Sequence, residues 1–152
     1  MLCPVCLREI GVTNGVVDPH TTERPHRVTG RKVFCPMSGK TPFVWDERST
    51  RQAVPNRSDG RCEFCCAARA TNMHHRKKVS QGGLWTPSNI LHVCGSGTTG
   101  CHGYFEEHPR IAYRLGVSVK RDQKPELVPV QTANGLLWLS DDIAPPLPGW
   151  AR

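Results

Sequence analysis

Two adjacent histidines, His74 and His75, are followed directly by Arg76, Lys77 and Lys78. Imidazole acts as a base near neutral pH and also binds divalent metal ions, so such a pair can supply both groups to one site. Lysine and arginine side chains bind the phosphates of nucleic acids through their charge, with little dependence on base sequence. The stretch therefore predicts a site that combines a base and a metal ligand with phosphate binding.

Four cysteines, two before this stretch and two after it, have spacings that favour a structural metal site. Cys62 and Cys65 form a C-x2-C pair, and Cys94 and Cys101 form a second pair with six residues between them. Because four thiolates suit tetrahedral zinc, we expect these cysteines to hold one structural Zn2+. Cys66 is left over and is expected to be a packed thiol.

A second structural Zn2+ is expected near the start of the chain. Cys3, Cys6 and Cys35 supply three ligands, and either His26 or His20 can supply the fourth. We favour His26, because it stands just before an expected strand that leads to Cys35. His20 lies in "DPHTTE", which reads as an open turn.

The cysteines are expected to be reduced and bound to metal. The first ten residues, "MLCPVCLREI", lack the basic and apolar regions of a signal peptide, and no stretch approaches the roughly 18 apolar residues that cross a bilayer. Only 38% of the residues are hydrophobic, so bound zinc is expected to support a small core. We therefore expect an intracellular protein with no membrane partner, and not a secreted disulfide protein.

The net charge of +7 is unevenly distributed along the chain. Residues 1–44 carry six Lys/Arg and three Asp/Glu, and residues 45–80 carry eight and four, whereas residues 81–115 and 116–152 are each balanced. An excess confined to the first 80 residues favours a polyanionic partner, most simply nucleic acid.

Turn-forming residues and shifts in composition divide the chain into four segments. Residues 1–44 are expected to form a zinc ribbon-like module, and residues 45–60 a short helix followed by a linker. Residues 61–115 contain five cysteines and both adjacent histidines, so we expect them to form the chemical centre. Residues 116–152 contain a hairpin signal at Asn134, followed by a proline-rich end.

The central segment is predicted to run strand, loop, strand, helix. The strands are expected at 71–79 and 89–93, separated by the turn-rich loop 80–88. A helix is expected from His102 until Pro109 ends it.

This arrangement resembles the HNH endonucleases, whose ββα-metal fold holds one divalent cation over a scissile phosphate. The resemblance covers roughly residues 61–109. The residues that carry it are His74, His75, Gly82, Gly83, Asn89, Cys94, Cys101 and His102, with Cys62 and Cys65 before them.

The resemblance implies a catalytic role for each matched polar residue. His75 corresponds to the general base, and Asn89 to the residue that holds this histidine and its loop. His74 and His102 correspond to ligands of the catalytic cation, which would be Mg2+, Mn2+ or Ni2+. Glu106 stands one helical turn beyond His102, where it either completes the metal site or faces solvent.

The expected fold is therefore α+β, with a small zinc-stabilised ββα-metal domain preceded by a zinc ribbon-like module. The expected function is hydrolysis of phosphodiester bonds in double-stranded DNA, which leaves 5′-phosphate and 3′-hydroxyl ends. The resemblance extends to proteins of phages and mobile elements, which implies the cytoplasm of a bacterial or phage-infected host. Nicking or double-strand cutting, sequence preference, oligomeric state and a packaging or other protein partner stay open.

The alternative is a non-catalytic zinc protein that only binds nucleic acid as an adaptor or regulator. Such a protein needs the cysteines and the basic surface, but it does not need His75, Asn89 and His102 in register. His92 and His108 are expected to be structural or exposed residues in either case.

Trp45 and Trp85 can in principle stack on bases. Packing against a small core is the expected role for both.

Overall fold

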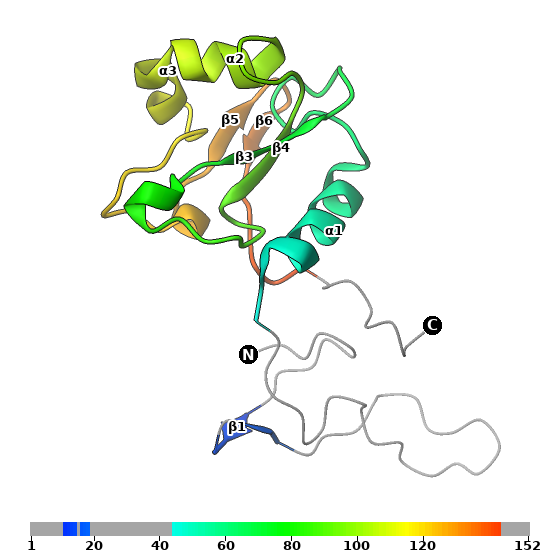
Figure 1. Cartoon of the computed structure of the whole chain (residues 1–152), viewed down its shortest axis with the longest axis vertical. Helices are drawn as coiled ribbons and strands as arrows, with labels where there is room; N and C mark the ends of the chain where they lie inside the picture. Colours follow the sequence, from blue (N-terminus) through cyan, green and yellow to red (C-terminus); the bar gives the residue numbers. More distant parts are fainter. Residues whose placement is uncertain (1–10, 15, 19–43, 144–152) are drawn as a thin grey trace, which may run out of the picture. The chain divides into compact units, whose positions relative to one another are not determined.

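The computed structural model describes residues 11–14, 16–18 and 44–143 (Figure 1). The chain divides into two compact units, of which residues 45–143 form one and residues 1–44 with 144–152 form the other. In the described part of the second unit, strand β1 (Val12–Thr13) pairs antiparallel with strand β2 (Val16–Val17).

Helix α1 (Glu47–Ser58) opens the unit formed by residues 45–143. A capping box begins it: the Asp46 carboxylate accepts a hydrogen bond from the Ser49 N–H, and the Ser49 hydroxyl accepts one from the Asp46 N–H. The helix continues through Pro55 and ends at Asp59, which adopts a left-handed conformation with φ 50°. The residues expected to form a linker are therefore the last turn of a helix.

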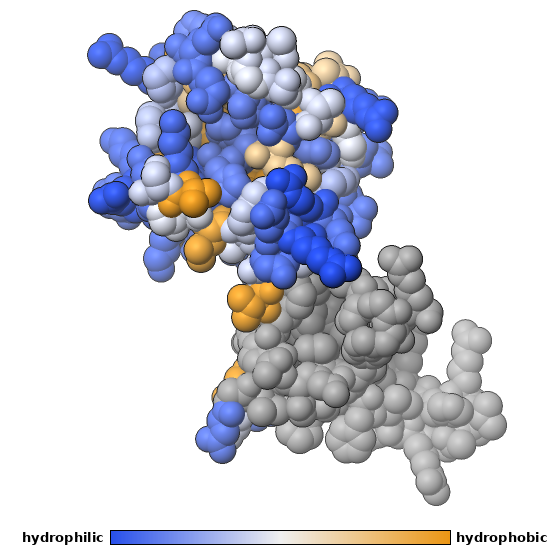
Figure 2. All heavy atoms as spheres, viewed as in Figure 1, coloured by the Kyte–Doolittle hydropathy of each residue, from blue (hydrophilic) through white to orange (hydrophobic). Residues whose placement is uncertain are grey.

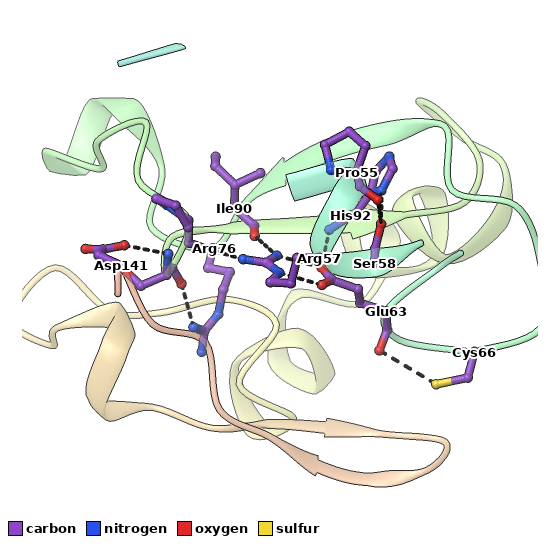
Figure 3. Close-up of polar contacts among 11 residues, drawn as sticks. Pro55, Arg57, Ser58, Glu63, Cys66, Arg76, Ile90, His92 and Asp141 are labelled. Carbon is purple, nitrogen blue, oxygen red and sulfur yellow. Dashed lines mark hydrogen bonds and ion pairs between the residues drawn. The ribbon is translucent and has the colours of Figure 1, made fainter. Parts of the chain in front are cut away.

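Arg57 explains why this last turn is ordered. Its guanidinium forms an ion pair with Glu63 at 2.7 Å and donates hydrogen bonds to the carbonyls of Pro87 and Ile90 (Figure 3). These contacts fix the end of α1 against the segment that enters the next strands. Tertiary contacts thus override the turn propensity of "PNRSDG".

Two antiparallel strands form the centre of the unit. Strand β3 (Asn72–His75) pairs with strand β4 (Ile90–Val93), so that Asn72 lies opposite Val93 and His75 lies opposite Ile90. The short helix η1 (Val79–Gln81) lies in the loop between them, and helix α2 (Gly100–Glu107) follows β4. The predicted order of strand, loop, strand and helix is confirmed.

The remaining chain returns to cover this centre. It comprises helix α3 (Pro109–Arg114), the short helix η2 (Pro125–Leu127), and strands β5 (Val130–Thr132) and β6 (Gly135–Leu137). Strands β5 and β6 pair antiparallel, with Thr132 opposite Gly135, so the predicted hairpin is confirmed.

One small hydrophobic core joins β4, α2, α3 and the β5–β6 hairpin. Its buried members are Cys62, Leu91, Val93, Phe105, Ala112, Val117, Val130 and Leu139. The Phe64 ring packs edge-on against Phe105, with 4.7 Å between the ring centroids. Because the core takes residues from the whole of 62–139, the C-terminal hairpin belongs to the same packed unit as the central segment.

The two ends of this unit meet. The indole N–H of Trp45 donates a hydrogen bond to the Asp141 carbonyl at 3.1 Å. The Asp141 carboxylate in turn accepts one from the Ser88 N–H at 2.7 Å (Figure 3). Trp45 therefore links the start of this unit to its end.

Residues 45–143 thus form a small α+β unit. Figure 2 shows that the visible face of this unit is mostly hydrophilic, with only small apolar areas. Within the described residues, none of the helices has the length and apolar character that crossing a membrane requires.

Candidate functional site

The four cysteines of the central segment come together in space. Cys62 and Cys65 lie in the turns after α1, Cys94 follows β4, and Cys101 lies in the first turn of α2. All four sulfur atoms lie within 4.8 Å of one another, and the Sγ atoms of Cys65 and Cys94 are 4.0 Å apart. Tetrahedral zinc with Zn–S bonds of about 2.3 Å requires sulfur atoms about 3.8 Å apart. The cluster can therefore hold a metal ion such as zinc.

Two glycines allow the long segment between Cys94 and Cys101 to close. Gly95 and Gly100 both have positive φ angles, 82° and 61°. A Cβ atom on Gly95 would lie 2.0 Å from the Thr99 carbonyl oxygen, which no other residue type can accept. The six-residue insert thus folds back on itself and brings Cys101 to Cys94.

The environments of the thiols suit a bound cation. Burial raises the pKa of Cys62 and of Cys101. Burial also acts to raise the pKa of Cys65, but hydrogen bonds from the backbone of Ala68 and Ala67 and from the side chains of Cys62 and Cys101 together outweigh it and lower this pKa to about 7. A nearby metal ion would favour the thiolate form of all four cysteines.

A second group of possible metal ligands lies at the end of β3 and on α2. His74, His102 and Glu106 each place one ligand atom within 4.8 Å of the others. The two imidazole rings face each other edge-on, with their centroids 5.5 Å apart. The Nε2 atom of His74 and the Nδ1 atom of His102 are buried and have no hydrogen-bond partner. Buried polar atoms without partners are uncommon, and a bound ion would satisfy them.

His74 is held in the neutral form that binds metal. Burial, followed by the nearby His102, lowers its pKa to about 4, although Glu106 opposes the shift. A hydrogen bond to the Val117 backbone also opposes it. At neutral pH the ring is therefore uncharged, and its Nε2 atom has no hydrogen-bond partner.

His75 lies beside this group but outside it. Its ring is half-buried and packs edge-on against Trp85, with 4.4 Å between the ring centroids. Its Nε2 atom is also without a hydrogen-bond partner. Burial, followed by the charge of Arg51, lowers its pKa, so the neutral base form is favoured.

Asn89 fixes the loop that follows His75. Its Oδ1 accepts a hydrogen bond from the Lys77 N–H at 2.8 Å. Its Nδ2 donates to the carbonyls of Lys77 and Leu84, at 3.1 and 2.9 Å. The side chain thus ties both ends of the β3–β4 loop together, in line with the loop-holding role expected from the sequence.

The expectation that Arg76 contacts phosphate is wrong for this structure. Its side chain is only 1% exposed, and the guanidinium donates hydrogen bonds to the carbonyls of Gly116, Ser88, Pro125 and Val128. Burial lowers its pKa to about 10, so it stays charged at neutral pH. A side chain engaged in this way has no donor left for DNA.

The two lysines that follow differ from Arg76. Lys78 is exposed, and the partly exposed Lys77 donates a single side-chain hydrogen bond, to the Gln123 carbonyl at 3.1 Å. Both remain candidates for phosphate contacts.

The other singled-out residues have structural contacts. His92 is buried with its Nδ1 atom 2.6 Å from the Ser58 hydroxyl (Figure 3), and the exposed His108 stacks on Tyr104. Cys66 lies outside the metal cluster, and its thiol points to the Glu63 and Phe64 carbonyls. The expected second zinc site of Cys3, Cys6, His26 and Cys35, with His20 as the alternative, lies outside the described residues.

One residue near the site was not identified from the sequence. Arg51, on α1, places its guanidinium 4.6 Å from the centroid of the Trp85 ring that packs against His75. Its only signal in the sequence is its position in the basic segment 45–80.

Comparisons with protein-family models, with curated proteins and with solved structures gave no match. The geometry of these side chains is therefore the basis for assigning a function.

Proposed function

We propose that this protein is a metal-dependent endonuclease of the HNH type, which hydrolyses phosphodiester bonds in DNA. The observation that carries the proposal is the convergence of His74, His102 and Glu106 beside His75. A purely structural metal site is already available in the cysteine cluster, so a structural role does not explain this second group.

His75 is the proposed general base. Its neutral imidazole accepts a proton from the water that attacks the phosphorus. The depressed pKa keeps the ring ready to accept this proton at neutral pH. Packing against Trp85 restricts the ring orientation, and Asn89 fixes the loop on which Trp85 lies.

His74, His102 and Glu106 are the proposed ligands of the catalytic cation. When bound, a divalent cation stabilises the negative charge that develops on the phosphoryl and leaving oxygens. The donor set of two imidazoles and one carboxylate fits such an ion, and three protein ligands would not complete its coordination. The exposure of Glu106 places this group at the protein surface, where DNA can reach it.

The remaining charged residues bind rather than react. Lys77 and Lys78 contact neighbouring phosphates of the DNA backbone. A zinc ion held by the four cysteines would fix β4 against α2, which carries His102. Such a site would be structural and would take no part in the chemistry.

Incubation with supercoiled plasmid tests this function. Purified protein is mixed with plasmid in Mg2+, Mn2+ or Ni2+ or with no added divalent ion, and open-circle and linear forms are separated on gels. Wild-type protein is expected to cleave only with added metal. Binding of the plasmid without cleavage under every condition would instead support a nucleic-acid-binding adaptor.

Substitutions separate the two roles of the histidines. His75→Ala is expected to lower the cleavage rate by roughly 10²–10⁴-fold, the range for loss of a general base. His102→Ala is expected to recover part of its activity at high Mg2+ or Mn2+, whereas His75→Ala is not. His108→Ala is the matched control, because this exposed histidine lies outside the metal-ligand group. Equal rescue of both active-site variants would contradict the assigned roles.

A further inference from the structure

Arg51 is held at the edge of the site by contacts that are not part of the ββα motif. The Thr50 hydroxyl donates a hydrogen bond to the Trp85 carbonyl at 2.8 Å, which fixes the β3–β4 loop against α1. The Arg51 guanidinium then lies over the Trp85 ring, 4.6 Å from its centroid. Cation–π stacking of this kind restricts a side chain that would otherwise move freely.

The same indole contacts the proposed base. The Trp85 and His75 ring centroids are 4.4 Å apart, so the guanidinium and the imidazole share one aromatic neighbour. A fixed positive charge therefore stands close to the position of the attacked phosphate.

Most of the guanidinium is free to bind a ligand. The Arg51 side chain is 52% exposed, and Glu47 is the one acceptor for it among the residues that the structure describes, at 2.8 Å from Nε. Exposed ion pairs one helical turn apart contribute little to stability, so a phosphate can compete with this carboxylate. The terminal nitrogens of arginine form the paired donors that suit phosphate oxygens.

We propose that Arg51 binds the DNA phosphate next to the attacked one, and that Trp85 positions its guanidinium for this contact. The inference rests on the proposed nuclease function, since the attacked phosphate is the one at His75. The guanidinium stacks on Trp85, which lies between it and His75, so it suits a phosphate beside the attacked one. Helix α1 thereby extends the DNA contact surface beyond the β3–β4 loop.

The salt dependence of DNA binding tests the contact without any need for cleavage. Binding of a short labelled duplex is measured by fluorescence anisotropy at several salt concentrations, with no divalent ion added. Arg51→Gln is expected to flatten the log–log slope by about 0.9, the value for one lost phosphate contact. Arg69→Gln removes an equal charge from an exposed arginine outside the site and is expected to leave the slope unchanged.

Two further variants keep the test independent of any folding defect in Arg51→Gln. Glu47→Gln removes the competing carboxylate and is expected to tighten DNA binding at fixed salt. Arg51→Lys keeps the charge, so it is expected to retain the slope, but it loses the paired donors and the stacking. Equal slopes for Arg51→Gln, Arg69→Gln and wild type, or unchanged affinity in Glu47→Gln, would overturn the proposal.

Cleavage distinguishes this inference from the function on which it rests. If wild-type protein cleaves plasmid, Arg51→Gln is expected to lower kcat/KM by about 10-fold or more, as for loss of a charged hydrogen bond. If wild-type protein does not cleave but Arg51→Gln still flattens the slope, the nuclease function fails while phosphate binding by Arg51 stands. If wild-type protein cleaves plasmid but Arg51→Gln leaves the slope unchanged, the nuclease function stands and phosphate binding by Arg51 fails.

Discussion

Replacing Arg76 with methionine tests whether this buried cation is structural. Methionine keeps an unbranched apolar stem but removes every donor that now reaches the carbonyls of Ser88, Gly116, Pro125 and Val128. A buried acceptor without a partner costs about 1–3 kcal/mol, so four of them set an upper range of roughly 4–12 kcal/mol. Because local rearrangement and water can satisfy some of them, we expect a loss of about 4 kcal/mol.

A loss of this size is a large part of the stability of a domain, which is typically about 5–15 kcal/mol. For a domain of this size, each 1 kcal/mol lowers Tm by about 4–8 °C, so Arg76→Met should lower Tm by roughly 15–30 °C. Melting followed by circular dichroism in the presence of zinc measures the change. Lys78→Met is the control, because Lys78 is exposed, and it is expected to change Tm little.

A small change in Tm combined with weaker salt dependence of DNA binding would refute a structural role for Arg76. If Arg76 were a DNA-binding residue, Arg76→Met would keep a Tm close to that of the wild type and would flatten the salt dependence of DNA binding by about 0.9. A structural Arg76 predicts a large fall in Tm. It also predicts no loss of slope in protein that is still folded at low temperature.

Three other substitutions test the metal cluster, the basic loop and the asparagine. Cys62→Ser is expected to lower the zinc content by one ion per chain and to abolish cooperative melting of residues 45–143, whereas Cys66→Ser should keep both, as measured by elemental analysis and calorimetry. Replacing Lys77 and Lys78 together with alanine should flatten the salt slope of duplex binding by about two units, and an unchanged slope would place the DNA elsewhere. Asn89→Ala leaves three backbone groups of the β3–β4 loop without their hydrogen-bond partner, so it should lower the free energy of unfolding by about 2–4 kcal/mol. Denaturant unfolding at the wild-type midpoint would contradict that estimate.

The sequence predicted the central strands, the hairpin and the cysteine cluster because each has a local signal. Alternating or short apolar runs, an Asn-Gly pair and thiols in close pairs are all visible without knowledge of tertiary contacts. The convergence of Cys94 with Cys101 depended on two positive-φ glycines, which are present in the printed "GSGTTG".

Arg76 shows where local signals fail. In the sequence it is one of three consecutive cations, and nothing in that run distinguishes the buried one from the exposed ones. Its partners come from as far away as Val128, so its environment exists only after the C-terminal segment has folded back. The alternation of a strand was a usable hint, since His74 and Arg76 are two residues apart and both are buried.

The contact between α1 and the β3–β4 loop could not be predicted from the sequence either. Trp85 is more than 30 residues away from Thr50 and Arg51, and their contact depends on how the helix packs beside β4. Composition marked the basic segment that contains Arg51, but it could not indicate which arginine lies near His75. Residues of this kind are assigned only from three-dimensional geometry.

The contact between Trp45 and Asp141 implies that residues 45–143 would tolerate circular permutation. Where the first and last residues of a folded unit lie together, a few added residues can join them, and new ends can be opened in an exposed turn. A permuted chain that joins residue 143 to residue 45 and begins after Asp122 should therefore keep the same core. By the same geometry, the unit could be inserted whole into a surface loop of another protein without forcing that loop apart.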